Sequence, residues 1–194
     1  MSPVGAIKVV GISGSLRKGS YNSALLRAAA ELLPDGMTLD VVDLAELPFY
    51  NNDVEQQGLP PGVQRFRERI AGADALLLAA PEYNFSISGV LKNALEWASR
   101  PPDPPMSGKP CALMGASVSP LGTARGQFHL RHVCVSLNAI ALNTPHVDVT
   151  EARKKFDDAG RLIDQPSLDS IRQLLAELRT FTLRLRGETS APVE

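Results

Sequence analysis

The segment from Gly11 to Asn22, GISGSLRKGSYN, has the composition of an anion-binding loop. Its small residues Ser13, Gly14 and Ser15 let a backbone turn sharply and come close to a bound anion. Arg17 supplies a planar fork of donors that suits phosphate oxygens, and the hydroxyl and amide side chains after it add further donors. The segment therefore predicts a phosphate site.

Two common phosphate-binding patterns do not fit this loop. Ser occupies position 13 and the spacing fails GxGxxG, and the loop does not match GxxxxGK[ST] either. Neither dinucleotide wrapping nor ATP binding is therefore expected. An ordinary strand-to-helix turn with Ser20 as the helix cap stays open as the simpler interpretation.

The segment from Pro81 to Arg100, PEYNFSISGVLKNALEWASR, begins where the most hydrophobic run of the chain ends. Pro81 followed by Glu82, Tyr83 and Asn84 predicts a rigid polar shelf, which suits a flat ring with one apolar and one polar end, such as a flavin. The alternative is a generic turn in which Ser86 caps the next helix and Tyr83 is a packing aromatic.

A third segment of similar composition is GASVSPLGTARGQ, from Gly115 to Gln127. Its glycines and small polar residues can close over one side of a ring, and Ser117 is the residue that we expect to contact it. Arg125 and Gln127 lie on the helix that follows. These two side chains could contact the site or a partner subunit. The alternative is that they are exposed to solvent and have no functional contact.

These segments need elements that hold them together. Strand and helix patterns alternate along the chain, which predicts a parallel sheet covered on both faces. The predicted strands are 7–12, 38–43, 73–80, 111–116, and 138–142 with 147–149. The predicted helices are 20–33, 63–72, 88–100, 123–137 and 165–186, and 44–62 is a long irregular connection.

An open sheet of this kind binds ligands outside the carboxyl ends of its strands, where the winding reverses. The three polar segments follow the first, third and fourth predicted strands, so they are expected to meet there. The predicted helix 88–100 is apolar around much of its circumference. One face must pack on the sheet, and the remainder either meets a second subunit or adds core contact within a monomer.

Composition narrows the classes of protein that fit. The 194 residues predict a single domain, 1–187, with a flexible tail at 188–194, and the net charge of -1 gives no reason to expect nucleic acid or a membrane as partner. Cys111 and Cys134 are predicted to be buried thiols rather than metal ligands. With no signal peptide and no long apolar run, we expect a cytoplasmic protein.

Taken together, the three segments resemble the NADPH-dependent FMN reductase family, closest to its bacterial quinone, chromate and azo-dye reductases. The resemblance spans Ile7 to Leu142. It implies a flavodoxin-like three-layer α/β sandwich with a five-stranded parallel sheet of order 2-1-3-4-5. It also implies that FMN is bound as the cofactor and that NADPH or NADH is the co-substrate. The implied assembly is a homodimer or homotetramer.

The resemblance also implies the residues of the flavin site. The FMN phosphate maps to the first loop: Ser13, Gly14, Ser15, Leu16, Arg17, Ser20 and Asn22. The flavin ring maps to Pro81, Glu82, Tyr83, Asn84 and Ser117. Ser88 replaces a Pro of many relatives, which is expected to soften the start of the helix, and Phe85 and Phe128 replace Tyr residues of the chromate-reducing branch.

The implied reaction passes hydride from the nicotinamide to the flavin, and then two electrons to a quinone, azo compound, chromate or similar small acceptor. The cofactor carries this chemistry, so no catalytic side chain and no metal is expected. Three alternatives stay open. They are a flavodoxin-like electron carrier, a flavin-free binding module, and a reductase that supplies free reduced FMN to a monooxygenase.

Overall fold

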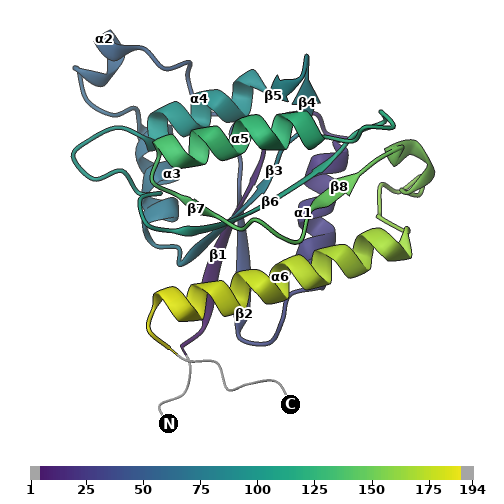
Figure 1. Ribbon diagram of the computed structural model, residues 1–194. Helices are drawn as coiled ribbons and strands as arrows, with labels where there is room; N and C mark the ends of the chain where they lie inside the picture. The colour runs from purple at the N-terminus through teal and green to yellow at the C-terminus, as the bar shows by residue number, and fades with distance from the viewer. Residues whose placement is uncertain (1–4, 189–194) are drawn as a thin grey trace.

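The protein is built around a parallel β-sheet, which the computed structural model in Figure 1 describes together with its helices over residues 5–188. Neighbouring strands follow the order β2-β1-β3-β6-β7, and β8 pairs with β6 as well. All of these pairings are parallel. The strands are β1 (Ile7–Ser13), β2 (Met37–Val42), β3 (Ala75–Ala79), β6 (Pro110–Ala116), β7 (Ile140–Ala141) and β8 (Val147–Val149).

Helices cover both faces of this sheet (Figure 1). One face carries α1 (Tyr21–Glu31) and α6 (Gln165–Leu185), and the other carries α3 (Pro61–Ala71), α4 (Gly89–Ala98) and α5 (Ala124–Ser136). A buried apolar cluster on each face joins the helices to the strands. The predicted flavodoxin-like sandwich and its strand order are confirmed.

The central strand β3 shows why this sheet forms. Its sequence ALLLA is buried at every position. Because helices cover both faces, a central strand needs apolar side chains in both directions. β3 pairs with β1 on one side and with β6 on the other. The carboxyl ends of these strands therefore lie next to one another.

Two short strands share the fifth position of the sheet, as the two predicted segments indicated. β7 pairs with the start of β6 at Pro110 and Cys111, and β8 pairs with its end, from Met114 to Ala116. The chain between them is anchored by Arg131 of α5, whose Nη1 donates to the Leu142 carbonyl at 2.6 Å. The edge of the sheet is therefore interrupted beside α5.

Some short elements were not predicted. A hairpin of β4 (Glu82–Tyr83) and β5 (Ser86–Ile87) turns at Asn84 and Phe85, whose φ angles are 48° and 66°. Asn adopts this left-handed region readily but a bulky residue such as Phe rarely does, so the sequence did not predict a hairpin with both residues in this conformation. The others are α2 (Asn52–Glu55) and the 3-10 helix η1 (Ala152–Lys154).

The long connection between β2 and α3 packs against α4. The indole N–H of Trp97 donates to the Pro48 carbonyl at 2.8 Å, and the Asn93 amide donates to the same oxygen at 2.9 Å. Trp97 is fully buried, and so are Leu91, Ala94, Leu95 and Ala98. Apart from Val90, which is partly buried, the apolar residues of α4 are therefore covered within one chain, and they give little support to a subunit contact.

Within residues 5–188, none of the helices combines the length and apolarity that a bilayer-spanning segment requires. At the carboxyl end, the N–H of Glu188 donates to the Leu183 carbonyl at 2.9 Å. The rest of the predicted tail, 189–194, lies outside the described residues.

Candidate ligand-binding cleft

A cleft of about 360 Å³ opens where the loops after β1, β3 and β6 meet. Small-molecule sites in proteins typically measure about 300–1,000 Å³, so the cleft is large enough for an organic ligand. Its position at the carboxyl ends of neighbouring parallel strands is the one predicted from the sequence. The lining consists of Ser15, Arg17, Ser20, Tyr21, Asn22, Pro81, Glu82, Tyr83, Ala116, Ser117, Val118 and Arg153.

The N-terminus of α1 lies at one end of this cleft. Ser20 caps the helix, because its Oγ accepts a hydrogen bond from the Ser23 N–H at 3.3 Å. First-turn N–H groups have no intrahelical acceptor, and those of Tyr21 and Asn22 have no other acceptor among the described residues. These N–H groups and the positive end of the helix dipole suit a phosphate.

Arg17 lies beside this helix end and is exposed. Its Nη2 donates to the Gly19 carbonyl at 2.7 Å, which holds the side chain over its own loop. No carboxylate in the described part of the chain pairs with the guanidinium, so its other donors are available to an anionic ligand.

Asn22 has a structural role that the sequence did not indicate. Its Nδ2 donates to the Ala116 carbonyl at 3.1 Å, and its Oδ1 accepts from the Ala116 N–H at 3.0 Å. Both ends of the amide are therefore occupied by the last residue of β6. The side chain joins the first loop to the third, and only the backbone N–H of Asn22 stays available to a phosphate.

Gly14 allows the first and second loops to pack together. A Cβ atom at this position would lie 2.8 Å from Cδ of Pro81 and 3.1 Å from Oγ of Ser88. Ser88 caps α4 by accepting from the Leu91 N–H, and its Oγ donates to the Gly14 carbonyl at 2.6 Å. The expectation that Ser88 softens the start of this helix is therefore wrong, as is the alternative that Ser86 caps it.

Glu82 fixes the β4–β5 hairpin to α5. Its carboxylate is only 5% exposed and forms an ion pair with Arg125 at 2.5 Å, while its Oε2 accepts from the Gly126 N–H at 2.9 Å. The guanidinium of Arg125 lies over the ring of Phe85, with its carbon 3.8 Å from the ring centroid. This cation–π contact covers the ring of Phe85, the residue whose φ angle is 66°. Arg125 therefore acts on the cleft through Glu82.

The third loop is held by the chain that follows β8. The Ser117 N–H donates to the Val149 carbonyl at 3.0 Å, and its carbonyl accepts from the Ala152 N–H at 3.0 Å. Farther along the loop, Thr123 donates from Oγ1 to Oδ1 of Asp148 at 3.1 Å. Burial raises the pKa of Asp148, and the hydrogen bonds from Thr123 oppose that shift.

Most of the predicted site residues meet in the cleft, namely Ser15, Arg17, Ser20, Asn22, Pro81, Glu82, Tyr83 and Ser117. Ser13, Gly14, Leu16 and Asn84 are not part of its lining. Ser13, the last residue of β1, and Gly14 after it are buried, whereas Leu16 and Asn84 are exposed.

Several lining residues were not predicted. Tyr21, Ala116 and Val118 lie inside the first and third segments, next to predicted residues, but their own side chains carried no signal for a ligand contact. Arg153 comes from η1, outside every motif, and no sequence signal indicated it.

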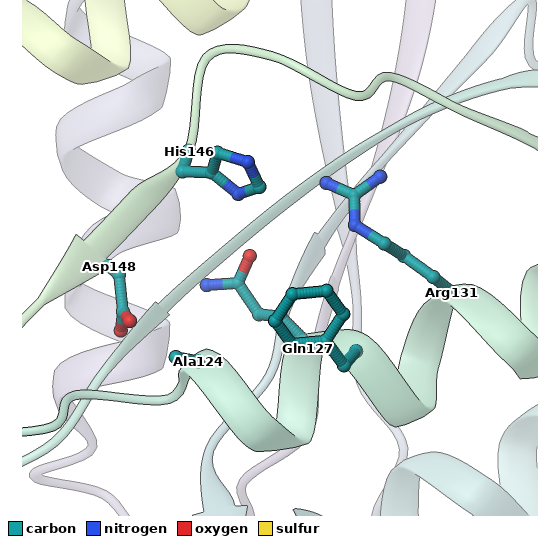
Figure 2. A pocket seen from close by; sticks show the side chains of 6 residues that line it. Ala124, Gln127, Arg131, His146 and Asp148 are labelled. Carbon is teal, nitrogen blue, oxygen red and sulfur yellow. The ribbon is translucent and has the colours of Figure 1, made fainter.

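A separate cavity of about 120 Å³ lies between α5 and the segment that leads into β8 (Figure 2). Gln127 lines this cavity and not the cleft, together with Arg131, His146 and Asp148. The Gln127 Nε2 donates to the Thr123 hydroxyl and to the Val147 carbonyl. The Oε1 atom of the same amide is buried and has no hydrogen-bond partner among the described residues. None of the predicted site residues lines this cavity.

Comparisons with known proteins show which family this chain belongs to. A family model described as NADPH-dependent FMN reductase matches residues 7–154. The chain is 54% identical over 181 residues to an NAD(P)H-dependent FMN reductase from Pseudomonas aeruginosa, covering 93% of this chain and 98% of that protein. It is 42% identical over 188 residues to an NADPH:quinone oxidoreductase from Arabidopsis thaliana, covering 94% and 95% of the two chains.

Among solved structures, the fold is similar to FerB, a flavoenzyme NAD(P)H:(acceptor) oxidoreductase from Paracoccus denitrificans. The TM-score is 0.84 at 27% sequence identity, and the match covers 92% of this chain and 98% of that one. The likeness of the fold therefore extends over nearly the whole chain.

Proposed function

Because this chain belongs to the NADPH-dependent FMN reductase family, we propose that it holds FMN in the cleft and uses NAD(P)H to reduce quinones and similar small acceptors. The observation that carries this proposal is the pairing of a phosphate-binding helix end with a shelf and a third loop around one cavity. Azo compounds and chromate are further acceptors within the same proposal.

The donors of the cleft fit the two ends of FMN. The free N–H groups of Tyr21 and Asn22, with the guanidinium of Arg17, offer charge-assisted hydrogen bonds to a phosphate. Pro81 and Tyr83 supply apolar surface for a ring, and the backbone beside them supplies polar groups for its edge. Both requirements are met within one cavity.

The chemistry that bound FMN supplies is two-electron transfer from NAD(P)H to the acceptor. The protein contributes position. Glu82 uses both carboxylate oxygens on Arg125 and Gly126, so we assign it to holding the shelf rather than to moving a proton. Ser117, held by Val149 and Ala152, keeps the third loop at a set distance from that shelf.

The test begins with the absorption spectrum of the purified protein after addition of FMN. Uptake of FMN with a shifted flavin spectrum is expected. A protein that stays colourless and rejects FMN would be a flavin-free module, which contradicts the proposal.

The loaded protein is then mixed with NADPH under nitrogen, and a benzoquinone is added afterwards. We expect rapid loss of the flavin colour with NADPH and its return with the quinone. A loaded protein that NADPH does not bleach would be an electron carrier. Release of the reduced flavin into the filtrate of a membrane concentrator would instead identify a reductase that supplies free FMN.

We also propose that the protein assembles as a homodimer or homotetramer. Phe128 and Val135 support this proposal, because they lie seven positions apart on one face of α5 and are 62% and 77% exposed. Light scattering after gel filtration tests it. A single monomeric mass across a wide range of protein concentrations would contradict it.

We further propose a cytoplasmic location, where reduced nicotinamide cofactors are available. Fractionation of cells that express the natural chain tests this proposal. Recovery of the protein with a membrane or an exported fraction would contradict it.

A further inference from the structure

Arg153 lines the cleft although it comes from η1, far along the chain from the three loops. Its side chain is exposed, and no acceptor in the described part of the chain pairs with it. The other cations of the segment that follows β8 are ion-paired: Lys154 with Glu151, Lys155 with Asp164, and Arg161 with Asp157. Arg153 is therefore the cation that this segment leaves available to a ligand.

The backbone around Arg153 is held on two sides. The N–H of Ala152 donates to the Ser117 carbonyl of the third loop at 3.0 Å. The ring of Phe156 packs on Tyr21 of α1, with 4.9 Å between the ring centroids. Arg153 is thus fixed at the rim of the cleft between two of its walls, and its guanidinium needs little backbone ordering to meet a ligand.

The charges of the cleft point to two anionic groups. Its lining contains the cations Arg17 and Arg153, and its one carboxylate, Glu82, is neutralised by Arg125. FMN carries a single phosphate, for which Arg17 and the N-terminus of α1 already provide donors. A second guanidinium without an acidic partner therefore matches a second phosphorylated ligand.

We propose that Arg153 binds the 2′-phosphate of NADPH and so makes the enzyme prefer NADPH to NADH. NADH lacks this phosphate and is otherwise the same molecule. The exposure of Arg153 suits a co-substrate that must enter and leave in every cycle, because little desolvation opposes the contact. This inference rests on the proposed function, since it concerns the co-substrate of the same cleft.

The test measures binding of NADP⁺ and NAD⁺ to the FMN-loaded protein by calorimetry. The Arg153→Gln variant is expected to bind NADP⁺ about 10-fold more weakly, with NAD⁺ unchanged within about twofold, because one charge-assisted contact is lost. Arg153→Lys should restore part of the affinity. In turnover, KM for NADPH should rise with kcat unchanged.

Lys154→Gln is the matched control, because it removes the neighbouring charge, which pairs with Glu151 and does not line the cleft. It should leave the ratio of the two affinities unchanged. A wild-type ratio in Arg153→Gln would overturn the inference. So would a loss of FMN affinity with that ratio unchanged, which would assign Arg153 to the flavin phosphate.

A wrong assignment of the proposed function would give a different result in the same experiment. The wild-type protein itself would then take up no FMN, before any nucleotide is added. The affinity ratio in Arg153→Gln decides the role of that residue only after the wild-type protein has bound FMN.

Discussion

Arg17 and Glu82 both carry full charges at the cleft, and their surroundings give them opposite roles. Arg17 is exposed and pairs with no carboxylate in the described part of the chain, so its guanidinium is available to a ligand. The side chain of Glu82 is 5% exposed and its oxygens are occupied by Arg125 and Gly126. The type of each residue suggested a ligand contact in both cases, and only the packing of the side chains separates them.

Arg17→Ala should weaken FMN binding by about 1.5–3 kcal/mol, because one charge-assisted contact with the phosphate is lost. The lower end applies, since Arg17 is exposed and solvent screens its charge. A fluorescence titration of the FMN-free protein measures the change. Lys18→Ala is the control, because Lys18 is next to Arg17 but does not line the cleft. Equal affinities of wild type and Arg17→Ala would remove Arg17 from the site.

Glu82→Gln should lower the free energy of unfolding by about 1–3 kcal/mol, because Arg125 loses its carboxylate partner and the amide can direct a donor at a donor. Urea denaturation of the FMN-free protein measures this change. Arg125→Lys loses much of the contact with Phe85 but keeps a cation beside the Glu82 carboxylate. It should therefore lower the free energy of unfolding by less than Glu82→Gln does. A Glu82→Gln protein as stable as wild type would mean that the hairpin does not depend on this ion pair.

At the scale of elements, the cleft depends on how closely three loops approach one another. Gly14 contacts the start of the shelf, and Ser88 links the N-terminus of α4 to the first loop through the Gly14 carbonyl. Asn22 links α1 to the end of β6. The first two contacts join the loops after β1 and β3, and the third joins α1 to β6, so the shape of the cleft is set by contacts between elements.

Gly14→Ala should destabilise the protein by about 1–3 kcal/mol and weaken FMN binding, because the added methyl would overlap with Pro81. Thermal unfolding with and without FMN measures both effects. Gly19→Ala is the matched control in the same loop, since a Cβ there meets nothing within 4 Å. If both variants behave alike, close packing at Gly14 is not what shapes the loop.

At the scale of the whole molecule, we expect one cleft to serve both NAD(P)H and the acceptor, because it brings together the predicted phosphate loop, the shelf and the third loop. Two other cavities, of about 350 and 400 Å³, lie beside α5 and contain none of the predicted site residues. The cavity shown in Figure 2 is about 120 Å³, too small for a nicotinamide dinucleotide. The two substrates are therefore expected to use the same space in turn.

Steady-state kinetics should accordingly follow a ping-pong pattern, with parallel double-reciprocal lines when NADPH is varied at several quinone concentrations. The physical reason is that oxidised nicotinamide must leave before the quinone can enter. Product inhibition supplies the control, since NADP⁺ should compete with the quinone. Intersecting lines would show that both substrates bind together, and the cleft would then need separate subsites.

The fold and much of the cleft could be predicted from local patterns. The buried run ALLLA, the alternation of strands and helices, and the loops after the first, third and fourth predicted strands all report the environment of nearby residues. Since parallel strands bring their carboxyl ends together, these patterns were enough to place Ser15, Arg17, Tyr83 and Ser117 at one cavity.

The contacts between residues far apart in the chain were decided only by the tertiary structure. Asn22 bonds to Ala116, Glu82 to Arg125, and Arg153 reaches the cleft from a short helix that no motif marks. The residue types permit many such pairs, and packing selects among them according to which side chains meet and which charges stay unpaired. The amino-acid sequence by itself determined the family, the fold and the place of the site. The folded chain determined which of its polar groups are free to bind a ligand.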